Sequence, residues 1–391
     1  MFARIFPILG ITFIDILGFS ILIPTLPYFA KHFGAPDHVV GLLFSVFAAC
    51  QFAAGPVWGY VSDRIGRKMV LIISQIGATI GWMMLAFANS LGLVFFARVV
   101  EGISGGNISV TQAYIADLVE PRQRARAFAY VGAAFSSGMV FGPIIGGLVY
   151  QHFGFTATFL VAAGLQFLTL VLTIVKLPES RARSAEAKVS SFGDIGRSLT
   201  DRRVSPVLLQ SWAFSLGLYA WFGVFALLLQ AALRFDVTEQ LYLMAGFGVL
   251  SVLSQVLLVG RVYDAVGDRL GSNIGIALAA VGFFSVPFIH TIATVIPTIV
   301  LFSLGMSMAR PGISALISRY APDDQRGTIL GTASALDNIS GVIMPPISTG
   351  TLERFGPGWA GLPSLIFSTI ALVMGLSGQR REAAQPAHET P

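Results

Sequence analysis

Five ionisable side chains lie inside long apolar stretches of the sequence, where charge is otherwise rare. They are Asp15, Arg98, Glu101, Arg310 and Asp337. A charged side chain at the centre of a bilayer costs roughly 3 kcal/mol on insertion scales, so such residues normally face a water-filled cavity or a partner of opposite charge. Their types allow two kinds of chemistry, namely the binding and release of protons and the formation of ion pairs.

Arg98 and Glu101 are three residues apart, which places them on one face of a helix and lets them pair. One interpretation of this spacing is a static salt bridge. The other is a switchable pair, in which proton binding to Glu101 frees Arg98 to meet a solute.

Asp15 is a second candidate for proton coupling, and Asp337 is a third. A carboxylate in a cavity can bind and release protons near neutral pH when burial disfavours its charge. The alternatives are structural, because Asp15 could hydrogen-bond to a broken helix and Asp337 could stabilise a contact between helices. The histidines offer no proton relay, since four lie at predicted helix ends and one lies in the tail; these are His32, His38, His152, His290 and His388.

The composition indicates a membrane protein. Of the 391 residues, 54% are hydrophobic and 12% are charged, whereas soluble proteins carry about 25% charged residues. A soluble fold could not hide that much apolar surface. The net charge of +5 is modest and does not indicate nucleic-acid binding. The single cysteine, Cys50, excludes an internal disulfide and a thiolate metal cluster.

Twelve segments are long enough to cross a bilayer, whose apolar core of about 30 Å needs roughly 20 residues in a helix. They lie at about 6–29, 40–61, 69–88, 91–113, 127–150, 155–176, 206–230, 240–261, 272–290, 293–316, 328–350 and 359–378. We therefore predict an all-α membrane protein of twelve transmembrane helices.

The longest break between these segments divides the chain. Residues 177–205 are basic and lack a hydrophobic period, so we predict a cytoplasmic linker there. It separates an N-terminal six-helix half, 1–176, from a C-terminal six-helix half, 206–378. The tail, 379–391, is polar, contains two prolines and is predicted to be disordered.

Basic residues gather on one side of the predicted membrane. Of the 25 Lys and Arg, only Lys31, Arg234 and Arg354 fall on the other side and two lie within helices, which leaves 20 on the first side. Cytoplasmic loops of membrane proteins are enriched in Lys and Arg. Both termini are therefore predicted to be cytoplasmic.

The two halves repeat each other in sequence. The loop Gly59–Lys68 after the second helix matches the loop Gly260–Arg269 after the eighth. The aligned pairs are Gly59/Gly260, Val61/Val262, Asp63/Asp264 and Gly66/Gly267 at an offset of 201, and Gln123/Gln325, Arg124/Arg326 and Pro143/Pro345 at an offset of 202. Two stretches in register on one membrane face indicate a duplicated six-helix unit with pseudo-symmetric halves.

At these residues the sequence resembles the major facilitator superfamily of transporters across nearly its whole length. The loop Gly59–Lys68 is similar to the signature between helices 2 and 3 of that superfamily. The resemblance implies that this loop latches a cytoplasmic gate, and the residues it assigns to this role are Gly59, Asp63, Gly66 and Arg67, with Asp264 and Gly267 in the second copy. A simple basic anchor loop is the alternative.

The chemistry of the same loop can be read directly. Gly59 lacks a side chain, so a neighbouring helix could approach closely there. Asp63 can accept hydrogen bonds at a facing helix N-terminus. In the second copy Asp268 stands where the first has Arg67, so we expect a weaker latch.

The fifth helix carries Gly138, Gly142 and Gly146, which repeat every four residues and form one smooth face. Pro143 removes a backbone hydrogen bond there and permits a bend. A packing face alone is one interpretation. Together with Gly147, the stretch is similar to the pattern of the superfamily's antiporters, and this resemblance implies export against a proton gradient.

Three further stretches resemble the twelve-helix drug–proton antiporters, which include tetracycline and quinolone exporters. They are Phe13–Gly18 with Pro24–Pro27 in helix 1, Arg98–Gly102 in helix 4 and Gly305–Pro311 in helix 10. The tetracycline exporters carry an aspartate in helix 3 and another in helix 9. The matching stretches here, Gly77–Leu85 and Ile274–Phe284, contain no acid.

The quinolone exporters place acids in helices 7 and 10, where this sequence has Phe222 and Ser307. The resemblance therefore implies the architecture and not these named substrates. Candidates for a substrate cavity are the two arginines and three aromatic residues, namely Arg98, Arg310, Tyr114, Tyr219 and Phe222. Aromatic rings would suit amphiphilic, ring-bearing solutes, and rings that face lipid are the alternative.

We predict a secondary active transporter that exports small amphiphilic compounds or drugs by proton antiport with alternating access. An importer or uniporter of a metabolite or nutrient is the alternative. No nucleotide-binding loop, zinc-type histidine pair or nucleophile elbow is visible, so we expect no enzyme, no metal and no cofactor beyond the proton gradient. The expected partners are the lipid bilayer of the cell membrane, a small-molecule substrate and protons, and the expected functional unit is a monomer.

Overall fold

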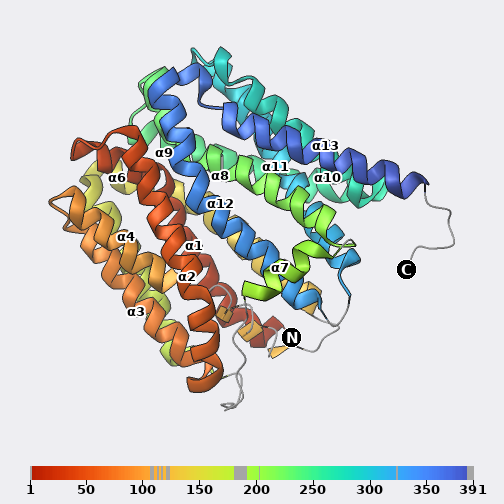
Figure 1. The fold of residues 1–391 in the computed structure, drawn as a ribbon. Coiled ribbons are helices and arrows are strands. Elements are labelled where there is room, and N and C mark those ends of the chain that lie inside the picture. The colour runs from red at the N-terminus through yellow and green to blue at the C-terminus, as the bar shows by residue number, and fades with distance from the viewer. Residues whose placement is uncertain are drawn as a thin grey trace. The chain divides into compact units, whose positions relative to one another are not determined.

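The computed structural model describes residues 2–105, 110–111, 114–115, 118–119, 124–179, 192–201, 203–322 and 325–384, and every regular element in these ranges is a helix (Figure 1). The first helices are α1 (Phe2–His32), α2 (Asp37–Ile65), α3 (Arg67–Ala86), α4 (Leu91–Gly105) and α6 (Arg124–Lys176). There follow α7 (Phe192–Thr200), α8 (Ser205–Leu233), α9 (Val237–Ser254), the π-helix η2 (Gln255–Val259), α10 (Gly260–Phe284), the 3₁₀ turn η3 (Val286–Phe288), α11 (Ile292–Tyr320), α12 (Arg326–Phe355), the 3₁₀ turn η4 (Pro357–Trp359) and α13 (Leu362–Ala384).

Two glycines divide the longest helices. Gly154 interrupts α6 with a φ of 73°, and Gly267 interrupts α10 with a φ of 77°. Glycine adopts this left-handed conformation at little cost, and it ends a helix. Divided there, with α9, η2 and the start of α10 counted as one segment, the described helices form twelve long segments in the predicted order. The predicted all-α fold is confirmed.

The repeat between the two halves is also visible in the backbone. Gly66 and Gly267, aligned at an offset of 201, have φ values of 103° and 77°. Gly154 and Gly356, at an offset of 202, have φ values of 73° and 84°. The second pair was not identified from the sequence, although Phe153 and Phe355 precede these glycines in the same way.

Two helical segments lie outside the predicted helices. Helix α7 lies within the predicted linker, where no hydrophobic period had indicated a helix. Helix α13 continues to Ala384, beyond the predicted end at residue 378. Asn273 Nδ2 donates a hydrogen bond to Gln379 Oε1 at 3.3 Å, which ties this extension to α10.

The chain divides into two compact units. Unit 1 comprises Met1–Ser190 and Phe235–Gly248, and unit 2 comprises Ser191–Arg234 and Val249–Pro391. Helix α9 is therefore shared, because its first part packs within unit 1. The predicted boundaries at residues 176 and 206 stay a prediction.

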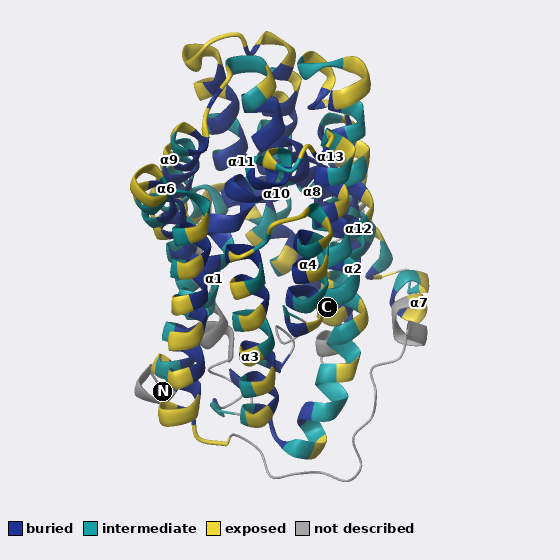
Figure 2. Cartoon of the chain, turned by 90° about the vertical axis from the view of Figure 1, so that its left-hand side faces the viewer, coloured by how far each residue is buried: buried dark blue, intermediate teal, exposed yellow. Residues whose placement is uncertain are grey.

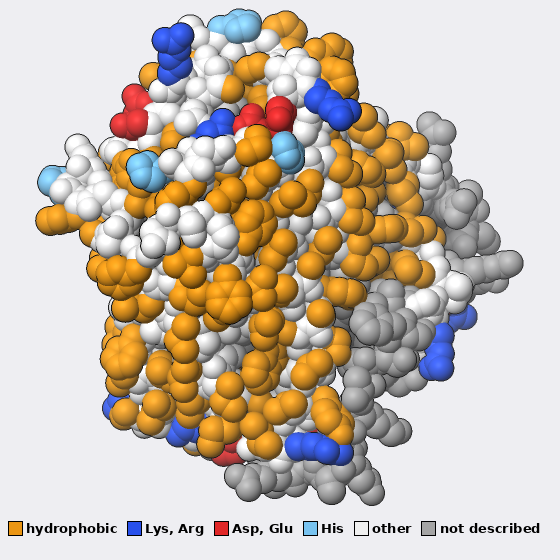
Figure 3. Space-filling view, turned by 60° about the vertical axis from the view of Figure 1, so that its left-hand side comes forward, with side chains coloured by type: hydrophobic (Ala, Val, Ile, Leu, Met, Phe, Trp, Pro, Cys, Tyr) orange, Lys and Arg blue, Asp and Glu red, His pale blue; other side chains and the backbone are white. Residues whose placement is uncertain are grey.

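Apolar side chains cover the outer surface of the helices. Figure 3 shows hydrophobic side chains over most of one face, with charged side chains near its two ends. Helix α3 illustrates the arrangement, because its exposed residues recur every three or four positions; they are Met69, Ile73, Ile76, Ile80 and Met83, followed by Phe87. Its opposite side carries the buried polar residues Ser74 and Gln75. An apolar outside and a partly polar inside suit a lipid environment.

Within the part of the chain that the structure describes, eight helices are long and apolar enough to cross a membrane, and two of them, Ser137–Lys176 and Val237–Phe288, are long enough to do so twice. Buried and exposed residues alternate along most of the helices, as Figure 2 shows. Among the spanning helices α8 is the most enclosed. Its side chains therefore pack against several neighbouring helices within unit 2.

Candidate proton-coupling and substrate sites

Arg98 and Glu101 form the most deeply buried ion pair of the described residues. Arg98 Nη1 donates to Glu101 Oε2, and the two side chains are 1% and 5% exposed. The guanidinium carbon of Arg98 also lies 4.2 Å from the centre of the Phe47 ring on α2. The spacing of three residues predicted this pair correctly, and its burial means that a charge removed from one partner would leave the other unpaired.

The pair does not satisfy all its polar atoms. Arg98 Nε, Arg98 Nη2 and Glu101 Oε1 are buried and have no hydrogen-bond partner among the described residues. The Glu101 side chain lies directly over Gly81 of α3, where a Cβ would overlap Glu101 Cγ. Gly81 lies in the stretch of helix 3 that contains no acid, so Glu101 of α4 brings a carboxylate to that position.

Asp15 lies in α1 and faces the second part of α6. Gln166 Nε2 donates a hydrogen bond to Asp15 Oδ1 at 3.2 Å and contacts Thr169 Oγ1 at 3.1 Å. Thr169 also interacts with the Asp15 carboxylate. Asp15 has no ion pair within the described part of the chain, so neutral donors alone meet its charge. Helix α1 continues through its prolines, which argues against the alternative of a broken helix.

Two buried glutamines were not identified from the sequence. Gln166 is one of them. The other is Gln75 of α3, which is 1% exposed and whose Nε2 and Oε1 have no partner among the described residues. A single Gln in an apolar stretch gives little signal, because its role depends on which helix faces it.

Asp337 and Arg310, which the sequence gave no reason to connect, form an ion pair in unit 2. Arg310 Nη2 of α11 lies 2.6 Å from Asp337 Oδ2 of α12. Ser215 of α8 donates a hydrogen bond to Asp337 Oδ1. The two charged side chains are 42% and 25% exposed, in contrast to the sealed pair of unit 1.

The aromatic residues of helix α8 differ in their surroundings. Tyr219 interacts electrostatically with both Asp337 and Arg310, and so lies beside the ion pair. Phe222 is partly buried, and its ring lies 6.1 Å from that of Phe302. Trp221 is 1% exposed and packs among rings of unit 2, so it faces neither lipid nor a solute.

Tyr114, predicted to line a cavity, lies in a hydrophobic core of unit 1. It is 1% exposed and packs in a cluster that includes Ile5, Ile8 and Leu71. Its hydroxyl donates a hydrogen bond to the carbonyl oxygen of Pro178 at 2.7 Å. This placement favours a structural role in holding the end of α6.

The glycines of the fifth helix form the packing face that one interpretation predicted. A Cβ on Gly138 would lie 2.9 Å from the Phe13 carbonyl oxygen, and one on Gly142 would overlap Ser20 Oγ. Gly146 meets Ile21 in the same way, so three turns of α6 pack closely on α1. Ser20 Oγ also contacts the Gly138 carbonyl oxygen at 3.0 Å.

The remaining residues of that motif contribute differently. Gly147 faces α9, where a Cβ would lie 3.3 Å from Leu241 Cβ. Gly248 of α9 in turn meets Val140 of α6. Helix α6 passes through Pro143 without a non-helical residue at that point.

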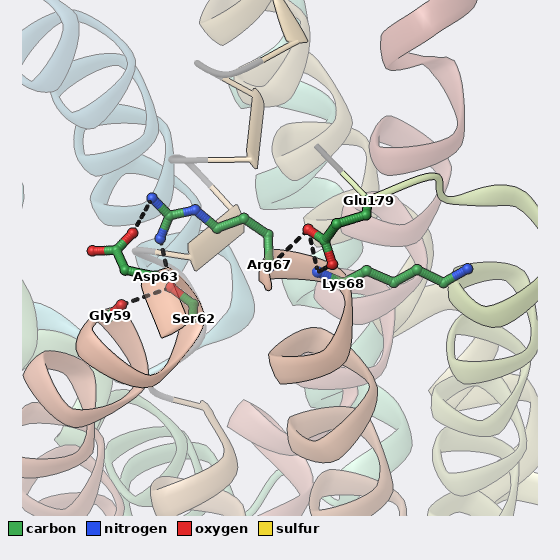
Figure 4. Close-up of polar contacts among 6 residues, drawn as sticks. All are labelled: Gly59, Ser62, Asp63, Arg67, Lys68 and Glu179. Carbon is green, nitrogen blue, oxygen red and sulfur yellow. Dashed lines mark hydrogen bonds and ion pairs between the residues drawn. The ribbon is translucent and has the colours of Figure 1, made fainter. Parts of the chain in front are cut away.

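The signature loop after α2 is held by charges (Figure 4). Asp63 Oδ1 lies 2.7 Å from Arg67 Nη2, and Arg67 Nη1 donates a hydrogen bond to Ser62 Oγ. Ser62 in turn donates to the Gly59 carbonyl oxygen at 2.7 Å. The predicted contact of Asp63 with a facing helix N-terminus stays a prediction. The expected close approach at Gly59 was wrong, because no described atom lies within 4 Å of where its Cβ would be.

Glu179, which the sequence did not single out, caps the start of α3. Its Oε1 accepts hydrogen bonds from the backbone N–H of Arg67 at 2.8 Å and of Lys68 at 3.3 Å. A Cβ on Gly66 would overlap the Glu179 carboxylate, so this glycine is needed for its space as well as its φ of 103°. The anion neutralises the positive end of the α3 dipole.

The second copy of the loop is built differently. Asp264 is exposed and has no ion pair within the described residues. Arg269 instead reaches α11, where its Nη2 contacts the Tyr320 hydroxyl at 3.3 Å. Gly267 keeps the positive φ of Gly66, whereas the second copy has no counterpart of the Asp63–Arg67 ion pair among the described residues. No group of three or more His, Cys, Asp or Glu that could hold a metal occurs among the described residues.

Comparison with known proteins identifies the family. The family model described as Major Facilitator Superfamily matches residues 8–233 and 207–391. The chain belongs to the Major Facilitator Superfamily. It is therefore a multi-pass membrane protein of a transporter family, and the resemblance inferred from the signature loop is confirmed.

Several relatives of this superfamily member cover nearly its whole length. The tetracycline resistance protein of class C from Escherichia coli is 30% identical over 98% of each chain. Multidrug resistance protein 2 of Bacillus subtilis (strain 168) is 25% identical over 86% of this chain and 85% of its own. The predicted likeness to the drug-resistance transporters of the superfamily is confirmed.

Solved structures show the same fold. A bacterial homologue of the human lysosomal transporter Spinster, in an inward-facing and unoccupied conformation, has a TM-score of 0.79 at 13% identity, over 96% of this chain and 97% of its own. The human organic anion transporter MFSD10 has a TM-score of 0.74 at 20% identity, over 95% and 98%. At such low identity these structures support the fold alone.

Proposed function

We propose that this transporter exports small amphiphilic compounds, drugs among them, in exchange for protons. The names of its tetracycline and multidrug resistance relatives support drug export. Because the matching stretches of α3 and α10 contain no acid, the proposal concerns amphiphilic compounds as a class and not tetracycline itself. Alternating access would move the compound, and transport rather than catalysis is the activity.

The observation that carries proton coupling is the environment of Asp15. Its carboxylate lies in a membrane-spanning helix, and its contacts are with the neutral side chains Gln166 and Thr169. A lone carboxylate in such a place is costly unless something neutralises it. A proton is the simplest neutraliser, so Asp15 is suited to gain a proton from one side of the membrane and release it on the other.

Glu101 is the second proposed proton carrier. A proton on Glu101 would cancel its attraction to Arg98 and leave the guanidinium with Phe47 as its remaining contact among the described residues. A buried cation without a counterion favours rearrangement of its helix. Asp337 is less suited to this work, because Arg310 and Ser215 already hold both of its oxygens.

Proton coupling is tested in liposomes that contain the purified protein and a pH-sensitive dye. An imposed pH difference should accelerate the flux of an amphiphilic solute, and protons should move in the opposite direction. Asp15→Asn should abolish the effect of the pH difference while solute exchange without a gradient persists. Asp37→Asn is the matched control, because Asp37 is paired with Lys31 at the start of α2. A flux that ignores the pH difference in the unmodified protein would refute the proposal.

We also propose that the protein works as a monomer in the cell membrane. We propose further that both termini lie in the cytoplasm, because Lys and Arg are concentrated on that side of the membrane. Single cysteines in a Cys50→Ala background test the orientation. Thr200→Cys in α7 should react with an impermeant maleimide only after the cytoplasmic side is opened. His290→Cys, in the exposed turn before α11, should react in intact cells.

A further inference from the structure

The two arginine–carboxylate pairs of this protein differ in access. Arg98 and Glu101 are 1% and 5% exposed, whereas Arg310 and Asp337 are 42% and 25% exposed. A pair as buried as Arg98 and Glu101 presents almost no surface that a solute could contact. The pair of unit 2 can be reached by one.

The contacts of the open pair leave the guanidinium with unused donors. Asp337 Oδ2 accepts a hydrogen bond from Arg310 Nη2 at 2.6 Å, and Asp337 Oδ1 accepts one from the Ser215 hydroxyl. Asp337 is the only hydrogen-bonding partner of Arg310 among the described residues. A guanidinium carries five N–H donors in a fixed plane, so most of the Arg310 donors have no hydrogen-bond partner among the described residues.

These free donors cannot simply face lipid. A guanidinium in contact with acyl chains is costly, and exposed cations in membrane helices normally meet water, a polar group or a ligand. The neighbours of Arg310 show which side of α11 its guanidinium occupies. They lie on α8 and α12, and the contacts come from Ser215, Tyr219 and Asp337.

One face of α8 continues from this polar group into an apolar one. Ser215, Tyr219 and Phe222 are spaced by four and three residues, so they lie in a row on the same face. Ser215 is held by Asp337, Tyr219 lies beside the ion pair, and Phe222 packs against Phe302. A compound with an oxygen acceptor at one end and a ring at the other would match this row.

We propose that Arg310 binds the acidic oxygen of the exported compound, and that ring-bearing organic acids are a substrate class of this transporter. This inference rests on the proposed export function and specifies its substrate. Carboxylate and enolate oxygens fit the planar donors of the guanidinium. Asp337 orients the guanidinium and, because it neutralises part of its charge, limits how strongly the acid is held.

Substitutions of Arg310 and of Asp337 should change the KM for an acidic solute in opposite directions. We would measure KM for a coumarin carboxylic acid and for its neutral methyl amide in liposomes under one fixed pH difference. Arg310→Gln should raise KM for the acid by roughly ten- to a hundredfold, because the acid loses a hydrogen bond to a charged group. Asp337→Asn should lower KM for the acid, because the guanidinium loses its competitor. The carbonyl oxygen of the amide is a neutral acceptor, so Arg310→Gln should raise KM for the amide much less, by about two- to tenfold, and Asp337→Asn should change KM for the amide less than KM for the acid.

A purely structural ion pair would behave otherwise. If Arg310→Gln and Asp337→Asn impair both compounds in the same direction, or if the unmodified protein does not export the acid, the inference is wrong. Arg310→Lys keeps a charge opposite Asp337 and so protects folding, and it should show a smaller loss for the acid because a lysine lacks the planar fork. Arg319→Gln, at the exposed end of the same helix, is the matched control.

The two proposals can fail separately. If the amide is exported under the pH difference but Arg310→Gln leaves the ratio of acid to amide unchanged, only the substrate inference falls. If neither compound responds to the pH difference, the proposed proton-driven export falls with it.

Discussion

Moving the carboxylate of Glu101 from α4 to α3 is the most direct test of how the sealed ion pair works. Glu101→Ala would leave Arg98, which is 1% exposed, without its counterion. Removing one partner of a buried pair costs about 3–5 kcal/mol. The cation–π contact with Phe47 persists and is worth about 0.5–2 kcal/mol, so we expect a net loss near the lower end, about 3 kcal/mol.

Gly81→Asp alone should also destabilise the protein, because its Cβ would overlap Glu101 Cγ. In the double variant the obstacle is gone. The nearest Glu101 atom that remains, its backbone nitrogen, lies 3.4 Å from the new Cβ, which is ordinary contact. The Cβ would also stand 3.4 Å from the former site of Glu101 Cδ, so the new carboxylate begins close to where the old one ended.

The expected result is strong non-additivity. Each single variant should lower the apparent Tm in detergent by on the order of 10 °C, and the double variant should recover most of that loss. Transport driven by a pH difference should follow the same order if the carboxylate itself, and not its helix, is what matters. If the decrease in Tm of the double variant equals the sum of the two single decreases, a carboxylate on Gly81 does not replace that of Glu101 and the reasoning is refuted.

Three further predictions concern packing, capping and backbone. Gly142→Ala should lower Tm because its Cβ overlaps Ser20 Oγ on α1, whereas Gly164→Ala on the same helix, with no atom within 4 Å, should leave Tm equal or slightly higher. Glu179→Ala should cost about 0.5–2 kcal/mol of stability through the lost cap of α3, measured by denaturation, and an unchanged stability would show that the cap is not needed. Gly267→Ala should destabilise unit 2 by about 1–2 kcal/mol because its φ is 77°, whereas Gly260→Ala at a φ of −55° should not, and equal Tm values for the two would contradict this.

The fold was predictable because a lipid bilayer permits few backbone structures. Long apolar segments must form helices in lipid, where no water satisfies the backbone. The breaks were predictable for a similar reason, since Gly66 and Gly267 fall at matching places of a repeated sequence. Helix α7 was missed because its nine residues are too few to show a hydrophobic period within a basic linker. The end of α13 was missed because hydropathy marks the membrane boundary and not the helix boundary.

The candidate sites were predictable only where one helix supplies both partners. Arg98 and Glu101 pair because they are three residues apart, and spacing shows this directly. Arg310 and Asp337 are 27 residues apart on different helices, so no sequence period connects them. Gln166 and Glu179 were missed for the same reason, because their partners are Asp15 and the start of α3, which depend on tertiary packing.

The same pair of chemical groups thus suits two tasks because of its surroundings. In unit 1, α3 offers Gly81 and α2 offers the Phe47 ring, so the Arg98–Glu101 pair is enclosed by small and aromatic groups and its charges depend on each other. Enclosure makes the energy of the pair sensitive to one proton, because no water compensates a lost charge. In unit 2 the pair spans two helices and a third, α8, supplies only a hydroxyl, so the guanidinium keeps an open edge. Partial exposure weakens the dependence on a proton and makes contact with a solute possible. Under the two proposals above, the enclosed pair exchanges the proton and the open pair binds the solute, and the burial of these four side chains is the observation that favours this assignment.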